Sequence, residues 1–121
     1  MVKVVMIAGL AAAGGLARYG IGVAVGTRSF PWATLAINIA GSLALGFVLK
    51  LGLDRGWPDR VVAAVAIGFL GAFTTFSTFS YETFTLIRTD RVTTAAIYVA
   101  ASLVGSVAAA AAGYALATST R

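Results

Sequence analysis

The segment from Gly71 to Glu82 is unusually rich in side chains that can bind an ion. It combines five serine and threonine hydroxyls, one carboxylate and three phenylalanine rings, and it directly follows a strongly apolar run. Hydroxyls donate hydrogen bonds to anions, and the edge of an aromatic ring carries a partial positive charge. The segment therefore has the chemistry to line a path for a small anion without a fixed charge that would trap it.

Two features extend this chemistry. Phe76 and Phe79 are three residues apart, so they share one face of a helix, and their hydroxyl-rich setting is a poor one for simple apolar filler. Asn38 lies within another apolar run, where an unpartnered amide facing lipid would be costly. Its NH2 group offers two donors to an anion. We therefore predict that all three side chains line a polar path.

The sequence lacks the residues on which most enzyme active sites depend. It has no cysteine and no histidine, and its acids are Asp54, Asp59, Glu82 and Asp90. Thiol and imidazole chemistry is therefore absent, and we predict that the protein is not an enzyme. Its nine Lys and Arg residues give a net charge of +5 but are scattered singly. Nucleic-acid partners require a basic patch, so we expect none.

The composition places the chain in a lipid bilayer, because 60% of its residues are hydrophobic and 11% are charged. One crossing needs about 20 apolar residues of helix. We predict an all-α, single transmembrane domain over residues 1–121, with spans at about 2–25, 30–51, 58–87 and 92–117. Pro31 and Pro58 suit first helical turns, and the turn after the second span is expected to start at Gly52. A cleaved signal peptide is the alternative at the N-terminus, but the apolar sequence continues to Val25.

Each predicted span carries a stripe of small or polar residues spaced four apart, which places them on one helix face. The stripes are Gly14, Arg18, Gly22 and Gly26; Thr34, Asn38, Ser42 and Gly46; Thr74, Thr78 and Glu82; and Tyr98, Ser102, Ser106, Ala110 and Tyr114. One such stripe would indicate ordinary helix packing. Stripes on all four spans, with an arginine, an asparagine and a glutamate among them, favour a polar pathway, because intramembrane ionisable groups are costly and usually functional.

The third span is predicted to be a broken helix. Residues 74–80 are nearly all β-branched, aromatic or hydroxyl-bearing, which lowers helix propensity, and Gly68 and Gly71 weaken the preceding turn. A break at membrane depth frees backbone carbonyls that can coordinate a cation. Gly71 and Thr74 are the candidates for that role. The alternative is an unbroken helix whose hydroxyls bond back to its own carbonyls.

The charges give almost no preference for one orientation in the membrane. Four spans put Lys3, Lys50, Arg55, Arg60 and Arg121 on one side, and Arg18, Arg28, Arg88 and Arg91 on the other. Membrane proteins normally show a clear excess of positive charge on the cytoplasmic side. We therefore predict that the chain inserts in both orientations and pairs antiparallel with itself.

Taken together, these residues resemble the CrcB/Fluc family of fluoride channels. The resemblance covers nearly the whole chain. It is carried by residues 14–19 (GGLARY), 38–41 (NIAG) and 68–82 (GFLGAFTTFSTFSYE), and by Tyr98 with Ser102 and Ser106. It implies a four-helix subunit that forms an antiparallel, dual-topology homodimer with two fluoride pores. A paired homologue could replace the second copy in a heterodimer.

The resemblance also implies roles for individual residues. Carbonyls of Gly71 and Thr74 match a structural Na⁺ site at the dimer centre, and Arg18 matches an arginine of an aqueous vestibule. The residues that match fluoride-pore positions are Asn38, Phe76, Phe79, Ser77, Thr78, Tyr98, Ser102, Ser106 and Glu82. The implied activity is passive export of fluoride across the bacterial or archaeal cell membrane.

Two other functions fit four short spans. A proton-coupled small multidrug exporter would need a carboxylate in the first span, which this sequence lacks. A purely structural membrane subunit would explain the glycines but not Asn38 or the phenylalanine pair.

Overall fold

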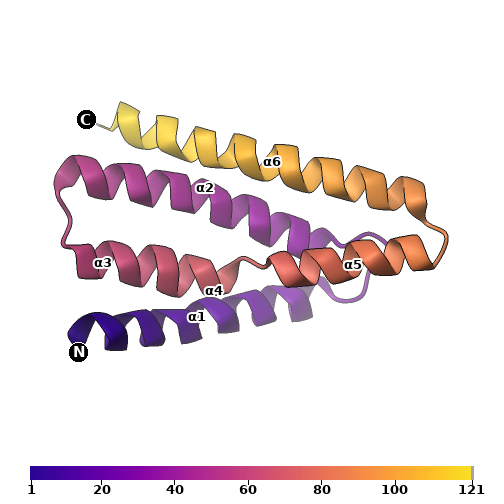
Figure 1. Ribbon diagram of the computed structural model, residues 1–121, viewed down its shortest axis with the longest axis horizontal. Coiled ribbons are helices and arrows are strands. Elements are labelled where there is room, and N and C mark those ends of the chain that lie inside the picture. The colour runs from indigo at the N-terminus through magenta and orange to yellow at the C-terminus, as the bar shows by residue number, and fades with distance from the viewer. Residues whose placement is uncertain (121) are drawn as a thin grey trace.

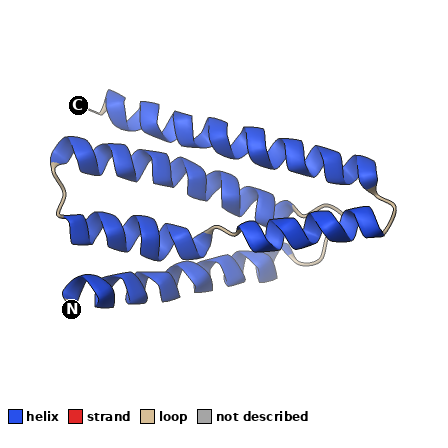
Figure 2. Ribbon diagram, in the orientation of Figure 1, coloured by secondary structure: helices blue, strands red, loops and turns tan. Residues whose placement is uncertain are grey.

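The chain is a bundle of helices in the computed structural model, which describes residues 1–120 and contains no strand within them (Figure 2). The helices are α1 (Val2–Val25), α2 (Trp32–Arg55), α3 (Asp59–Ala63), the π-helical turn η1 (Ala64–Leu70), α4 (Gly71–Phe73), α5 (Phe76–Arg88) and α6 (Val92–Ser119). Within the described residues, four stretches are long and apolar enough to cross a membrane, namely α1, α2, the combined third span from Asp59 to Arg88, and α6. The predicted all-α, four-span fold with a broken third helix is confirmed.

Several helix ends differ from the predicted ones. The second helix continues through Gly52, which is buried against Trp57 and Val62, and it ends where Gly56 adopts a left-handed φ of 60°. The turn expected to start at Gly52 was therefore wrong: the helix continues to Arg55 and ends at the left-handed Gly56. Pro31 and Pro58 are helix caps that precede the first helical residue, rather than members of the first turn. Arg121, counted above among the basic residues of one side, lies outside the described residues.

The spans run up and down, so the start of α1, the end of α6 and the α2–α3 connection lie at the same end of the bundle (Figure 1). The most extensive contact joins α2 and α6, and the next joins α1 to η1. The third span changes its partner along its length: η1 and α4 pack on α1, whereas α5 packs on α6. The break lets one span belong to two helix pairs.

Small residues let these helices approach closely. A Cβ atom added to Gly14 of α1 would overlap the carbonyl oxygen of Phe69, and one added to Gly113 of α6 would overlap that of Leu43. Helices in lipid associate through such close packing, because apolar surface gains little from leaving one apolar medium for another. Part of the glycine pattern in the stripes is thus explained by packing.

The break itself lies at Thr74 and Thr75, between α4 and α5. Both residues are extended, with ψ of 158° at Thr74 and φ of −151° at Thr75. The Thr74 hydroxyl and N–H both donate to the Leu70 carbonyl, at 2.9 and 3.0 Å, which closes the first half-helix. The Thr75 hydroxyl accepts from the Thr78 N–H at 3.2 Å and caps the second half-helix.

Candidate functional site

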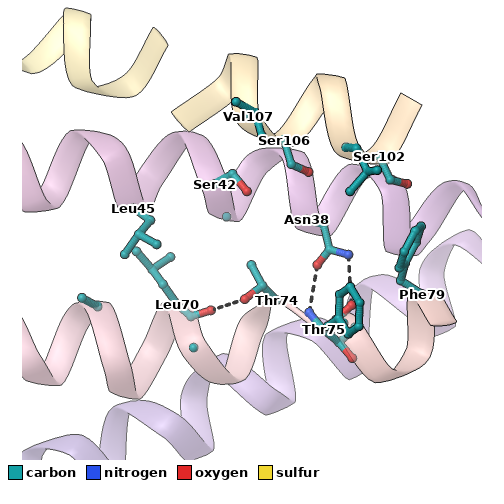
Figure 3. Close-up of a pocket in the computed structure, with 15 residues that line it drawn as sticks. Asn38, Ser42, Leu45, Leu70, Thr74, Thr75, Phe79, Ser102, Ser106 and Val107 are labelled. Carbon is teal, nitrogen blue, oxygen red and sulfur yellow. Dashed lines mark hydrogen bonds between the residues drawn. The ribbon is translucent and has the colours of Figure 1, made fainter. Parts of the chain in front are cut away.

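Asn38 contacts the break from α2 through both ends of its amide (Figure 3). Its Nδ2 donates to the Thr75 carbonyl at 3.1 Å, and its Oδ1 accepts from the Thr75 N–H at 2.8 Å. Only this orientation of the amide satisfies both backbone groups. One N–H of Asn38 remains beyond these two bonds, so the side chain keeps a donor for an anion.

The bond from Thr75 to Asn38 leaves a carbonyl free in the preceding turn. In an uninterrupted α-helix the Thr75 N–H would donate to the Gly71 carbonyl, but here it donates to Asn38. The Ala72 carbonyl accepts from Arg18 Nε of α1 at 3.2 Å. Arg18 therefore reaches the break itself. The backbone oxygens of Gly71 and Thr74 are suited to a cation, since hard cations prefer oxygen ligands.

The two half-helices present opposite partial charges at the break. The half from Asp59 to Phe73 ends there with its negative carbonyl end, and α5 begins there with its positive N–H end. A cation is favoured at the first and an anion at the second. The break therefore offers both kinds of site within two residues of chain.

A cavity of about 300 Å³ opens beside the break, between the third span and the packed pair of α2 and α6 (Figure 3). We call it the break cavity. Its polar lining residues are Asn38, Ser42, Thr74, Thr75, Ser102 and Ser106, and Gly71, Phe76 and Phe79 also line it. The structure thus brings together parts of three predicted stripes: Asn38 and Ser42 of the second span, Thr74 of the third, and Ser102 and Ser106 of the fourth. Apolar residues such as Leu45 and Val107 complete the lining.

The phenylalanine pair occupies one end of the break cavity, but its members differ in burial. Phe76 is 76% exposed, whereas Phe79 is 9% exposed. Their ring centroids lie 5.7 Å apart with planes inclined at 47°. Phe79 also packs on Tyr98, with centroids 5.2 Å apart, so one ring is fixed in the core while the other lies on the open face.

Tyr98 and Glu82 form a polar pair deeper in the protein. Tyr98 is fully buried, and its hydroxyl donates to Glu82 Oε1 at 3.3 Å. Phe30 of the α1–α2 connection packs edge-on against the Tyr98 ring. Glu82 also lines a separate cavity of about 360 Å³, next to Arg28 and Arg91. Tyr98 and Glu82 do not line the break cavity.

Ser102 carries a buried hydroxyl without a hydrogen-bond partner among residues 1–120. A serine in a helix ordinarily bonds back to a carbonyl of the preceding turn, and leaving it unpaired is costly. The residue lines the break cavity from α6. Ser102 therefore places a hydroxyl with no partner among residues 1–120 in the wall of the break cavity.

The remaining predicted residues lie toward the α1–α2 connection. Arg18 and Thr78 line a cavity of about 590 Å³ together with Thr34 and Thr75. Ser77 is exposed, and its hydroxyl lies 3.4 Å from that of Thr75. Thr75 was missed as a site residue, although its position three residues before Thr78 fits a helix cap. Ser42 was noted in a stripe and not selected.

The chain is similar to known proteins over almost its whole length. Residues 5–114 match the family described as CrcB-like protein, Camphor Resistance (CrcB). The chain is 42% identical over 112 residues to the fluoride-specific ion channel FluC of Bordetella petrii, covering 92% of this chain and 88% of that protein. It is also 42% identical over 118 residues to FluC of Rhodospirillum centenum, covering 92% and 94%, and 40% identical over 107 residues to FluC of Geobacter sulfurreducens, covering 85% and 86%. With its four spans, its broken third helix and this match, the chain belongs to the CrcB family.

Proposed function

We propose that the protein is a fluoride-selective passive channel that lets the anion leave the cytoplasm across the cell membrane. The observation that carries the proposal is the break cavity, where hydroxyls, an amide N–H and aromatic rings gather beside the positive end of α5. The names of the relatives point to the same ion. No ATP is required, because fluoride that enters as the neutral acid and ionises inside leaves down its own gradient.

The lining suits a small, strongly hydrated anion. Fluoride gives up its water only where donors replace it, and Asn38, Ser102, Ser106 and the edges of Phe76 and Phe79 are the donors we assign to it. The polar path is completed by Ser77, Thr78, Tyr98 and Glu82, with Arg18 in the vestibule. Chloride is larger and more weakly hydrated, so a narrow lining of this kind selects against it.

A second copy of the chain, in antiparallel orientation, is the partner that we assign to the open face. The break cavity is open, and Phe76 and Gly71 are exposed beside it. Polar groups such as Asn38 and Ser106 would otherwise face hydrocarbon, where unsatisfied groups cost several kcal/mol. Two copies would give two pores. A paired homologue in place of the second copy is the alternative partner.

A structural Na⁺ between the two copies is the cofactor that we assign. The carbonyls of Gly71 and Thr74 from each copy would hold it, and the diversion of the Thr75 N–H to Asn38 supports the Gly71 assignment. The ion would neutralise carbonyl ends that face one another across the dimer. The chain supplies no carboxylate cluster for a metal within residues 1–120, which suits a monovalent cation held by neutral oxygens.

Efflux from liposomes tests the proposal. Purified protein is reconstituted into liposomes loaded with fluoride or chloride, and each anion is followed with its own electrode after a potassium ionophore is added. Rapid fluoride loss with negligible chloride loss is the expected result. Absence of fluoride flux from folded, dimeric protein would refute the channel. Drug uptake driven by a proton gradient would instead favour the small multidrug exporter.

A further inference from the structure

The Asn38 side chain takes the position that a neighbouring backbone would have in a β-bridge. Its oxygen accepts from the N–H, and its nitrogen donates to the carbonyl, of the same extended residue, Thr75. A buried extended segment needs partners for both groups, and a membrane interior has no water to supply them. The carboxamide is the side chain with the donor and the acceptor in the right places.

The bond to Asn38 competes directly with helix closure. Without it, the Thr75 N–H has a partner one turn back, the Gly71 carbonyl, and regular helix would satisfy both groups. Closure would then remove the Gly71 oxygen from any ligand. It would also remove the free N–H end of α5, on which the anion path depends.

The α2 surface around Asn38 accommodates the broken helix closely. Gly41 lies one turn further along α2, and a Cβ there would overlap the Thr74 methyl group. The Thr74 methyl group therefore packs against the backbone of α2 at Gly41, while the Asn38 side chain bonds to Thr75. The two positions act together, since residues three apart share a helix face.

We infer that Asn38 is a positioning residue, which holds the third helix open by taking the Thr75 N–H from the Gly71 carbonyl, and which thereby makes that carbonyl available to a cation. Its remaining N–H serves the anion path. The inference rests on the proposed function for the identity of the ions, but the opening of the helix is measurable without any ion flux.

The labelling test uses the sequence itself. Asn38 is the only asparagine, and Gly71 is the only glycine that lies four residues before a threonine. Protein labelled with ¹³Cγ-Asn and ¹⁵N-Thr in lipid is expected to give an Asn–Thr contact by solid-state NMR. Protein labelled with ¹³C-carbonyl glycine and ¹⁵N-Thr is expected to give the directly bonded Gly26–Thr27 signal and the same-turn Gly71–Thr74 signal, but no Gly71–Thr75 signal. An unaltered protein without the Asn–Thr contact would overturn the inference.

Two isosteric variants separate the two hydrogen bonds. Asn38→Leu removes both, so the hydrogen-bonded Gly71–Thr75 contact should appear. Asn38→Asp keeps the acceptor for the Thr75 N–H and loses only the donor, so that contact should stay absent although the added charge lowers fluoride flux. Thr118→Val is the matched control, because within residues 1–120 the Thr118 hydroxyl bonds only to its own helix, at Tyr114.

The stabilisation of the protein by Na⁺ is a further readout, because a merely structural role of Asn38 would leave it unchanged. Thermal unfolding is compared in Na⁺ and in an impermeant organic cation. Wild type and Thr118→Val should be stabilised by Na⁺, and Asn38→Leu should lose about two- to tenfold in apparent Na⁺ affinity, the range expected for one backbone hydrogen bond. Equal Na⁺ responses in wild type and Asn38→Leu would overturn the link to the cation.

A second substitution should restore the open helix. Proline suits the first residue of a helix and forces the residue before it out of helical conformation, so Phe76→Pro in α5 favours the extended Thr75. The double variant Asn38→Leu/Phe76→Pro should regain the Na⁺ response and lose the Gly71–Thr75 contact, without regaining flux. Wild type that shows both NMR results but no fluoride flux would refute the channel and leave the positioning role intact.

Discussion

At the scale of single residues, Phe76 and Phe79 have the same side chain but differ in burial. Substituting each one therefore separates an effect on fluoride conduction from an effect on stability. Phe79 is 9% exposed and Phe76 is 76% exposed in one copy. Replacing either ring by isoleucine removes a ring edge from the proposed path, so fluoride efflux should fall sharply in both variants. Phe79→Ile should also lower the free energy of unfolding by about 2 kcal/mol, whereas Phe76→Ile should leave the packing of one copy intact. Unchanged efflux in both would mean that the rings only fill space.

Ser102→Ala removes one hydroxyl oxygen and tests its effect on stability and on conduction separately. The Ser102 hydroxyl is buried without a partner, so its removal should leave stability unchanged or raise it by about 1 kcal/mol. Fluoride efflux should nevertheless fall, because a donor leaves the break cavity. Efflux and thermal unfolding are measured on the same preparation. A destabilised variant with normal efflux would contradict the assignment.

Sequence patterns could identify the site residues one helix at a time but not their partners. Periodicity selected Asn38, and low helix propensity predicted the break after Gly71; both residues line the break cavity. It did not indicate that Asn38 bonds to the Thr75 backbone, because that contact spans 37 residues and has no local signal. The family resemblance supplied the ion, which no residue pattern fixes.

At the scale of helices, the effect of a glycine-to-alanine substitution on stability should depend on whether the glycine contacts a neighbouring helix. Gly113→Ala places a methyl group against the Leu43 carbonyl between α6 and α2, and overpacking of this kind costs about 1–3 kcal/mol. Its matched control is Gly20→Ala in α1, where a Cβ meets nothing within 4 Å and better helix propensity should leave stability equal or slightly higher. Thermal unfolding in detergent measures both. Equal losses would contradict the packing.

The number of membrane spans could be predicted from the sequence, but the residues at which the helices end could be predicted less well. Hydropathy gives four spans because length and apolar content set a crossing. The end of α2 depends on the left-handed Gly56 rather than on Gly52, and both are glycines in the same loop region of the sequence. Gly52 is packed against Trp57 and Val62, a tertiary contact that the sequence pattern does not reveal.

At the scale of the whole molecule, the weak charge bias leads to a test of orientation. Basic residues at the two ends are nearly balanced, and two of them at the end with the termini are offset by Asp59 and Asp54 in ion pairs with Lys3 and Lys50. Reporter fusions at the C-terminus should therefore give signal on both sides of the membrane. Adding two lysines beside Arg28 should shift the population toward one orientation. A wild-type signal confined to one side would contradict antiparallel pairing.

The opposed half-helices at Thr74 and Thr75 also determine the range of the electrostatic potential around the break. Each helix end carries roughly half an elementary charge, and here a negative end and a positive end lie two residues apart. Viewed from a distance the two nearly cancel, so their joint potential decays much faster than that of a lone charge. The break therefore attracts an ion that has already arrived at it, while it leaves the surrounding pool of larger anions undisturbed.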